Sequence, residues 1–489
     1  MDKIIIKIKE KDDIFVFLII FLITIGISLN ISIEASDEIW NFQNVYKMYN
    51  GFKIYQDMNV IITPLFFLLA EGIFHVFGAN LFVFRISHCF EYTILYVFIY
   101  KLMKKIGISK NISLIAIFTM ILQGKYSAIR MCFNYNIMAF MFCVMGIYFL
   151  IKDNNRKNYL IQSIMTLIIF LTKQNIGIYY MIGILLYIFI EEDKKKSKIK
   201  ESLKYCILVA LGICTFLMVM LIDHNLGNFL NYTFGGIIEF AEENIFGNIS
   251  NILCLVLIIG VSIAISIIAV NKKVFNTTQT RNIKILSIFS VVMAMIVYPI
   301  FNWPHIWIGI HIAIINIIYI IYLLFKDLAN IIIKISKYLS FLLAIFLIVN
   351  SLINLYDWLC VIKSKEYPYK WEDPFFGGMI LKETYDKNER VIEYIRNNDK
   401  TVIILSNRAA LYMIPLKQNN GEFDLPFKGN LGKEGEKGLI RKIQNLKNTQ
   451  ILITKSEEED IYQEIPEIKK YVKQVKTYIG DIEEFEIYE

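Results

Sequence analysis

The feature that most constrains the fold of this chain is a series of long apolar segments that recurs between residues 14 and 356. A helix that crosses a bilayer needs about 20 mostly apolar residues. Hydrophobic residues make up 56% of the sequence and charged residues 19%, against roughly 45–50% and about 25% in soluble proteins. The sequence predicts a polytopic α-helical membrane protein with about 11 transmembrane helices, at 14–33, 81–103, 111–124, 132–151, 159–172, 176–190, 203–222, 251–270, 283–301, 305–325 and 337–356.

The last part of the chain has a different pattern. Strands are expected at 401–407, 450–456 and 484–489, and helices at 388–398 and 435–448. Alternation of this kind is typical of a small α/β domain. We therefore divide the chain into a membrane module, 1–356, and an α/β domain, 357–489. Within the module, residues 34–80 form a first loop, and its apolar segment 64–78 is too short to span and predicts an interfacial or re-entrant helix.

The distribution of charge predicts the orientation. Lysine and arginine are concentrated in the short loops that follow every second span, as the positive-inside rule requires of cytoplasmic loops. This places the N-terminus in the cytoplasm and the first loop and the α/β domain outside, in a multi-pass protein of the cell membrane. The net charge of +7 is spread over these loops, so nucleic acid is not an expected partner. The seven cysteines show no metal-ligand spacing and are expected to be small membrane hydrophobes.

An acidic pair, Asp37 and Glu38, follows the first apolar segment directly. Aromatic residues at near-helical spacing come next, which predicts a helix lying on the membrane that holds the carboxylates above its surface. A carboxylate in that position can take a proton from an acceptor hydroxyl, which is general base catalysis. The second carboxylate can orient the first or hold a metal ion. No cofactor is certain, and a divalent Mg²⁺ or Mn²⁺ ion bound by the pair is left open.

Basic residues are expected near the same outer face. Lys125 and Arg130 lie between two spans, Lys173 lies between two half-length apolar segments, and Arg85 comes early in a span. Charge at membrane depth is costly and is usually functional. Cations at this face suit an anionic ligand such as the phosphate of a lipid. The alternative for each is an interfacial side chain that extends to water.

A short outward turn at 298–311 carries Asn302 and His305 beside tryptophans. A histidine in such a setting is either an interfacial anchor or part of a site. Asp57 follows Gly51 and is either a turn residue or a further acidic site residue. The sequence contains no HExxH, P-loop or GxSxG motif, so a nucleotide enzyme of the soluble type is not supported.

Five segments carry a resemblance to a known family: "DEIWNFQNVYKMYNGFKIYQD" (37–57), "TPLFFLLAEGIFHVFG" (63–78), "FRIS" (84–87), "TKQNIG" (172–177) and "YPIFNWPHIW" (298–307). Their order, over nearly the whole chain, resembles the GT-C integral-membrane glycosyltransferases, and within them the protein O-mannosyltransferase and aminoarabinose transferase branch that uses polyprenyl-phosphate sugars. Two positions depart from the pattern of that branch: Ile61–Thr63 replace a Glu-Lys pair, and Asn302 stands where an acidic residue is common.

The resemblance implies an inverting enzyme that moves a single sugar from a polyprenyl-phosphate donor to an acceptor at the outer face of the membrane. Asp37 would be the base, Glu38 its partner and Asp57 a second acidic position. Lys173 and Gln174 would meet the donor phosphate. The expected partners are the donor, membrane lipids and a glycan, lipid or protein acceptor.

Three other functions stay open at this stage. A transporter or flippase of lipid-linked glycans would favour internal repeats and charges deep within spans, for which Glu71 and Glu91 are the residues to check. A GT-C-like polymerase or ligase would move an oligosaccharide. A receptor built around the α/β domain would tolerate replacement of Asp37.

Overall fold

The computed structural model describes most of the chain, and the statements below concern these residues. They are 2–33, 37–126, 132–152, 159–191, 195–236, 249–271, 275–298, 301–325, 329–424, 429–455 and 466–489.

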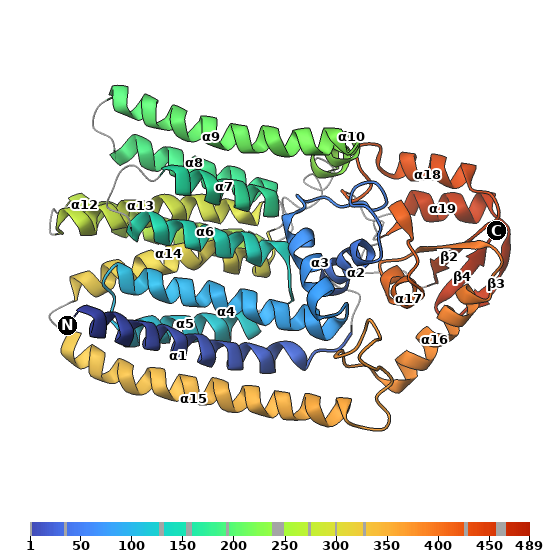
Figure 1. Ribbon diagram of the computed structural model, residues 1–489, viewed down its shortest axis with the longest axis horizontal. Coiled ribbons are helices and arrows are strands. Elements are labelled where there is room, and N and C mark those ends of the chain that lie inside the picture. The colour runs from blue at the N-terminus through green and yellow to red at the C-terminus, as the bar shows by residue number, and fades with distance from the viewer. Residues whose placement is uncertain are drawn as a thin grey trace.

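The membrane module is a bundle of helices that lie side by side (Figure 1). Within the described residues, nine helices are long and apolar enough to cross a membrane, and Lys110–Gln123 and Tyr159–Thr172 are shorter apolar helices. The expected polytopic helical fold is confirmed. The bundle consists of α1 (Asp2–Leu29), α4 (Leu81–Lys105), α5 (Lys110–Tyr126), α6 (Tyr135–Lys152), α7 (Tyr159–Thr172), α8 (Gln174–Glu191), α9 (Lys195–Ile222), α12 (Ile249–Asn271), α13 (Thr277–Ala294), α14 (Trp303–Leu324) and α15 (Ala329–Ile362).

The burial of the helices separates an inner from an outer layer. In the apolar window of α4, 72% of the residues are buried, whereas only 17% are buried in α9 and in α15. The exposed side chains of α9 and α15 are largely leucine, isoleucine, valine and phenylalanine. Apolar side chains can stay uncovered in this number only where lipid replaces water. A helix can lie in lipid because its backbone hydrogen bonds are satisfied internally. These two helices therefore face the bilayer.

The first loop forms two short helices that cover one end of the bundle. These are α2 (Asp37–Tyr49) and α3 (Leu65–Phe77), and α3 packs against α2, α4 and α7. With 13 residues, α3 is about 20 Å long and cannot cross the apolar core of a bilayer. The short helix α10 (Leu226–Leu230) and the π-helix η1 (Asn231–Gly235) lie at the same end, where Asn225 donates a hydrogen bond of 2.6 Å to the carbonyl of Ile54.

The C-terminal residues form a small domain around a four-stranded sheet of order β1-β2-β4-β3. Strands β1 (Thr401–Leu405) and β2 (Thr449–Thr454) are parallel, while β4 (Phe485–Tyr488) is antiparallel to β2 and to β3 (Tyr478–Ile482). The helices of the domain are α16 (Lys382–Arg396), α17 (Ala409–Leu416), α18 (Gly435–Asn445) and α19 (Pro466–Val475), with the 3-10 turns η4 (Gly421–Phe423) here and η2 (Met295–Val297) in the bundle.

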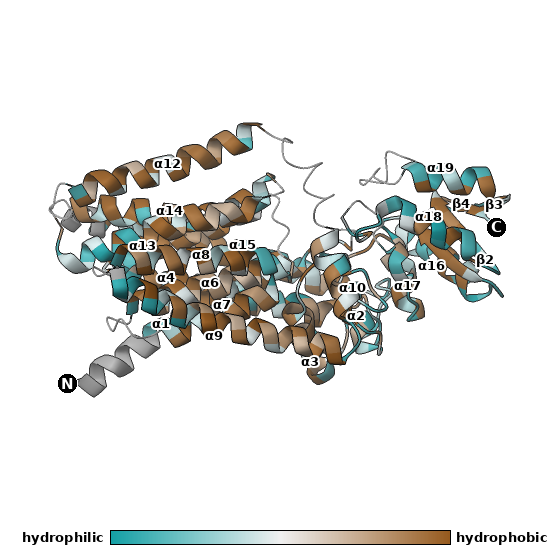
Figure 2. Ribbon diagram, turned by 90° about the horizontal axis from the view of Figure 1, so that it is seen from above, coloured by the Kyte–Doolittle hydropathy of each residue, from teal (hydrophilic) through white to brown (hydrophobic). Residues whose placement is uncertain are grey.

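This domain lies at the end of the bundle that carries α2 and α3 (Figure 1). Figure 2 shows the contrast between the two parts, since the bundle is predominantly hydrophobic and the domain has hydrophilic segments throughout. The domain contacts the first loop directly: Asn59 donates to the carbonyl of Asp424 at 2.9 Å, and Asn80 donates to the carbonyl of Trp371 at 2.9 Å. The first loop is thus enclosed between the bundle and the α/β domain.

Candidate active site

The two acidic residues at the start of α2 have different surroundings. Both lie in the first helical turn, where carboxylates complement the partial positive charge of a helix N-terminus. Asp37 is exposed, whereas Glu38 is buried. The pair is therefore divided into a carboxylate that a substrate can reach and one that is enclosed by protein.

Glu38 forms a bidentate ion pair with Arg85 of α4. The Arg85 Nε donates to Glu38 Oε1 at 3.0 Å, and its Nη2 donates to Oε2 at 2.7 Å. The Nη1 donates to the carbonyls of Ile31 at 2.8 Å and of Gly377 at 3.3 Å. Arg85 is buried and holds together α2, α4 and residue 377. These contacts favour a role in positioning Glu38 over direct contact of Arg85 with a donor phosphate.

Lys173 occupies the break between α7 and α8. Its Nζ donates a short hydrogen bond to Asn136 Oδ1 and lies 5.2 Å from the centre of the Tyr135 ring. Burial lowers the pKa of Lys173 to about 8, and the opposite charge of Asp37 partly offsets this effect. At neutral pH the amine therefore remains mostly protonated.

Asp37 and Lys173 approach one another through an aromatic contact. Trp40 lies one turn after Asp37 on α2, and its ring packs edge-on against Tyr135 with centres 6.1 Å apart. Tyr135 in turn lies beneath the Lys173 ammonium. Through these contacts Asp37 and Lys173 lie at the same end of the bundle.

The turn before α14 lies within electrostatic range of Lys173. Asn302 caps α14 by accepting the backbone N–H of His305 at 3.2 Å, and it also contacts the His305 ring. His305 interacts electrostatically with Lys173. The structure thus brings together Asp37, Lys173 and His305 from three regions of the chain.

The other sequence candidates are not all part of this group. Asp57 accepts the backbone N–H of Lys53 at 2.7 Å and so closes a turn in the first loop. Gln174 is buried and donates to the carbonyls of Ile61 at 3.0 Å and Thr233 at 3.2 Å. Lys125 lies in the last turn of α5, and Arg130 lies outside the described residues. The catalytic and binding roles of all these residues stay predictions.

Two residues that contact Lys173, Tyr135 and Asn136, were not among the sequence candidates. Their signal is the polar "NYN" at residues 134–136, at the start of an otherwise apolar helix. Asn134 caps that helix by accepting the backbone N–H groups of Asn136 and Ile137 at 2.9 and 3.1 Å. The cap fixes the first turn of α6, and Asn136 reaches Lys173 from that turn.

The metal considered for the acidic pair has little support from the donor atoms. Among the residues that the structure describes, no group of three or more His, Cys, Asp or Glu side chains could hold an ion. Both oxygens of Glu38 already accept hydrogen bonds from Arg85. A Mg²⁺ or Mn²⁺ ion at Asp37 and Glu38 therefore stays a prediction.

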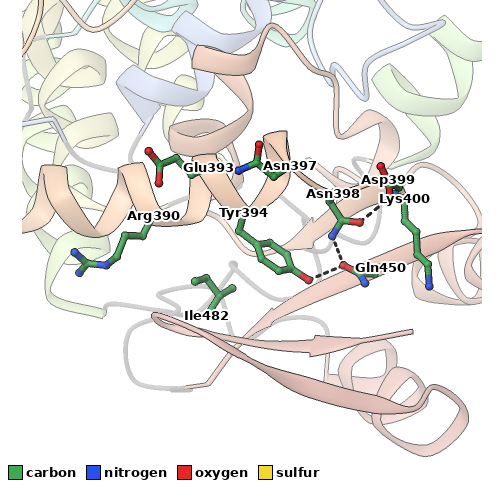
Figure 3. Close-up of a pocket in the computed structure, with 9 residues that line it drawn as sticks. All are labelled: Arg390, Glu393, Tyr394, Asn397, Asn398, Asp399, Lys400, Gln450 and Ile482. Atoms are coloured by element: carbon green, nitrogen blue, oxygen red, sulfur yellow. Dashed lines mark hydrogen bonds between the residues drawn. The ribbon is translucent and has the colours of Figure 1, made fainter.

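A polar groove of about 700 Å³ lies elsewhere, on the α/β domain (Figure 3). It is lined by residues of α16, of the turn at 397–400 and of the sheet. Some of its polar side chains form hydrogen bonds with one another: Tyr394 donates to Gln450 Oε1 at 2.6 Å, and Asn398 also contacts Gln450. None of its lining residues is one of the sequence candidates, so the groove is separate from the site around Asp37.

Comparisons with known proteins agree with this architecture. Residues 62–222, which include Lys173, match the family model described as dolichyl-phosphate-mannose-protein mannosyltransferase. A comparison with curated proteins finds no match. ArnT from Cupriavidus metallidurans bound to undecaprenyl phosphate is 10% identical, with a TM-score of 0.56 and coverage of 97% of each chain. The apo state of the same protein is 9% identical, with a TM-score of 0.57 and coverage of 98% of each chain.

A third structure, the Archaeoglobus fulgidus oligosaccharyltransferase in complex with Zn and sulfate, has a TM-score of 0.50 and 12% identity. It is matched over 96% of this chain and 72% of its own length. The protein therefore has the GT-C fold of membrane-embedded glycosyltransferases. Residues 62–222 are similar to the protein mannosyltransferase family model, and the whole chain is similar in fold to ArnT.

Proposed function

We propose that the protein transfers a single sugar, with inversion, from a polyprenyl-phosphate donor to a glycan, lipid or protein at the outer face of the membrane. The observation that carries this proposal is that an exposed carboxylate, Asp37, and the Lys173 ammonium lie at the same end of the bundle, on either side of the Trp40–Tyr135 contact. A transfer of this kind needs a base near the acceptor hydroxyl and a cation near the donor phosphate. The base and the cation must be no farther apart than the length of the bound substrate. The ArnT structure with undecaprenyl phosphate supports a polyprenyl-linked lipid as the donor.

In the proposed reaction, the acceptor oxygen attacks the anomeric carbon of the sugar from the side opposite the phosphate. The bond from that carbon to the phosphate oxygen breaks, and polyprenyl phosphate leaves with the electron pair. Asp37 accepts the proton of the acceptor hydroxyl. Lys173, held by Asn136 and Tyr135, stabilises the negative charge that develops on the phosphate.

The distribution of charge supports action at the outer face. At the bundle end away from the α/β domain, α4 finishes with Lys104 and Lys105, and α6 finishes with Lys152. Lys110 pairs with Asp12 at 2.8 Å near the same end. The positive-inside rule assigns such an end to the cytoplasm. Asp37 and the α/β domain would then lie outside.

The proposal can be tested by incubating the purified full-length protein with a panel of prenyl-phosphate sugars. We expect release of polyprenyl phosphate together with transfer of one sugar to an added acceptor. Transfer of only an oligosaccharide from a prenyl diphosphate would instead support a ligase. Movement of the lipid-linked sugar across a vesicle membrane without cleavage would support a flippase.

Donor affinity is expected to fall as the pH rises through about 8, because the pKa of Lys173 is about 8 and the neutral amine no longer attracts phosphate. Lys173→Ala should weaken binding at neutral pH by about tenfold or more and remove this pH dependence. Binding of labelled polyprenyl phosphate, measured across the pH range, checks both results. Lys53→Ala, at an exposed lysine of the first loop, is the control. Unchanged affinity in Lys173→Ala would exclude the proposed phosphate contact.

A further inference from the structure

The helix that carries Asp37 is also held by the α/β domain. Lys47 lies in the last turn of α2 and forms an ion pair with Asp424, which follows η4. The two side chains are 3% and 1% exposed, so this pair is completely enclosed. Lys47 follows Asp37 by ten residues on one continuous helix, which is about 15 Å along the axis. A shift of Lys47 therefore moves Asp37.

Hydrogen bonds surround this ion pair. Asn59 donates to the carbonyls of Asp424 at 2.9 Å and of Asn430 at 3.2 Å. Asn419 donates to the carbonyl of Asp57 at 2.7 Å. These bonds join the first loop to the segment 419–430 of the α/β domain, and α17 packs against α2 beside them.

The N-terminal end of α2 is fixed separately. There, the bidentate pair of Glu38 with Arg85 ties the first turn to α4, and Arg85 reaches the carbonyl of Gly377. The α/β domain thus reaches both ends of the helix, indirectly through the contact of Gly377 with Arg85 at one end and directly through Asp424 at the other. The domain therefore contributes to fixing the position of the helix at both ends.

Stability alone does not favour the buried ion pair of Lys47 and Asp424. Taking two charges out of water costs several kcal/mol for each ion in general, and apolar residues of similar size are often as stable. Gln43 Oε1 and Asn44 Nδ2 are also buried, and neither has a hydrogen-bond partner among the described residues. Burial lowers the pKa of Lys47 to about 7, which shows how strongly the surroundings oppose the charge.

We infer that the α/β domain positions the catalytic base, and that Lys47 and Asp424 are the positioning residues through which it acts. The inference rests on the proposed function, since it assigns Asp37 the role of base. The domain holds α2 at the distance from Lys173 that sugar transfer requires. Lys47 itself contacts neither substrate nor donor.

Two single substitutions test this inference. Lys47→Met and Asp424→Asn should each lower kcat by about tenfold or more, because small displacements of a reacting group reduce rates steeply. The affinity for polyprenyl phosphate should change less than about twofold, since Lys173 stays in place. Lys47→Arg keeps the charge and should retain most of the activity. Lys442→Met, which breaks the exposed Lys442–Glu422 pair of the same domain, is the matched control and should leave kcat unchanged.

Hydrogen exchange gives a readout that does not depend on activity. In Asp424→Asn the amides of α2 should exchange faster, while those of α4 stay protected. If either substitution prevents folding, Asn59→Ala loosens the same contact without leaving a charge buried and should show the same pattern with a smaller loss.

An unchanged kcat per folded molecule in both single variants, or unchanged exchange of α2, would overturn the inference. A parallel loss of donor affinity would also overturn it, since Lys47 would then act on the donor. Failure of the wild-type protein to transfer any sugar would instead reject the proposed function, so the two failures are distinguishable.

Discussion

Replacement of Asp37 by asparagine is expected to lower kcat by about 10²–10⁴-fold, the usual contribution of a general base. The amide has the shape of the carboxylate but cannot accept the proton of the acceptor hydroxyl. Asparagine is also well tolerated at the start of a helix, so α2 should still form. Because Asp37 is exposed, the substitution does not place a new polar group in the protein interior. Donor affinity should fall by much less than kcat, since the phosphate is assigned to Lys173 and the loss of the Asp37 charge only lowers the pKa of that amine further.

The measurement is sugar transfer by the purified variant under saturating donor, together with binding of polyprenyl phosphate. Asp223→Asn is the matched control, because Asp223 is an exposed aspartate at the same end of the bundle. A correctly folded Asp37→Asn protein with the wild-type turnover rate would remove Asp37 from the mechanism. A large loss of donor affinity would place Asp37 at the donor instead.

The membrane part of this fold could be predicted from local sequence because each spanning helix satisfies its own backbone. Length alone distinguished α3 from the spanning helices, and α3 indeed has 13 residues. The break at Lys173 was also visible, since a charge there separates two short apolar segments. Such features depend on neighbours in the sequence.

The contacts within the site depend on residues that are far apart in the sequence, and these could not be derived. Glu38 and Arg85 were assigned to two different tasks, yet they form one ion pair across 47 positions. Nothing in the sequence around Lys47 indicates that its partner is Asp424. A single lysine on a helix rich in aromatic residues predicts that it has an acidic partner, but it does not indicate which residue that partner is.

The strands of the α/β domain could also be predicted only in part from the sequence. Strands β1, β2 and β4 are apolar and were expected, whereas β3 was not. The strand β3 lies at the edge of the sheet with much of its surface exposed, and it contains Gly480 and Asp481. An edge strand needs no continuous apolar pattern, so periodicity does not reveal it.

Arg85→Met is expected to cause the largest loss of stability, about 3–5 kcal/mol, as is usual when one partner of a buried ion pair is removed. The Glu38 carboxylate would remain buried without its cation, and the carbonyls of Ile31 and Gly377 would each lose a donor. Arg85→Lys keeps a charge but cannot form the bidentate contact, so its loss should be intermediate.

Thermal unfolding of the purified variants checks this prediction and also decides between two roles for Arg85. If Arg85 positions Glu38, Arg85→Met should melt well below the wild type, and Arg85→Met combined with Glu38→Leu should recover part of the loss because no buried charge remains. Lys204→Met, which breaks the surface pair with Glu201, should cost less than about 1 kcal/mol. If Arg85 instead binds the donor phosphate, Arg85→Met should melt near the wild-type temperature and lose donor affinity. The 2.7 Å contact with Glu38 favours the first result, because a guanidinium that already bridges a carboxylate and backbone carbonyls has few donors left for a ligand.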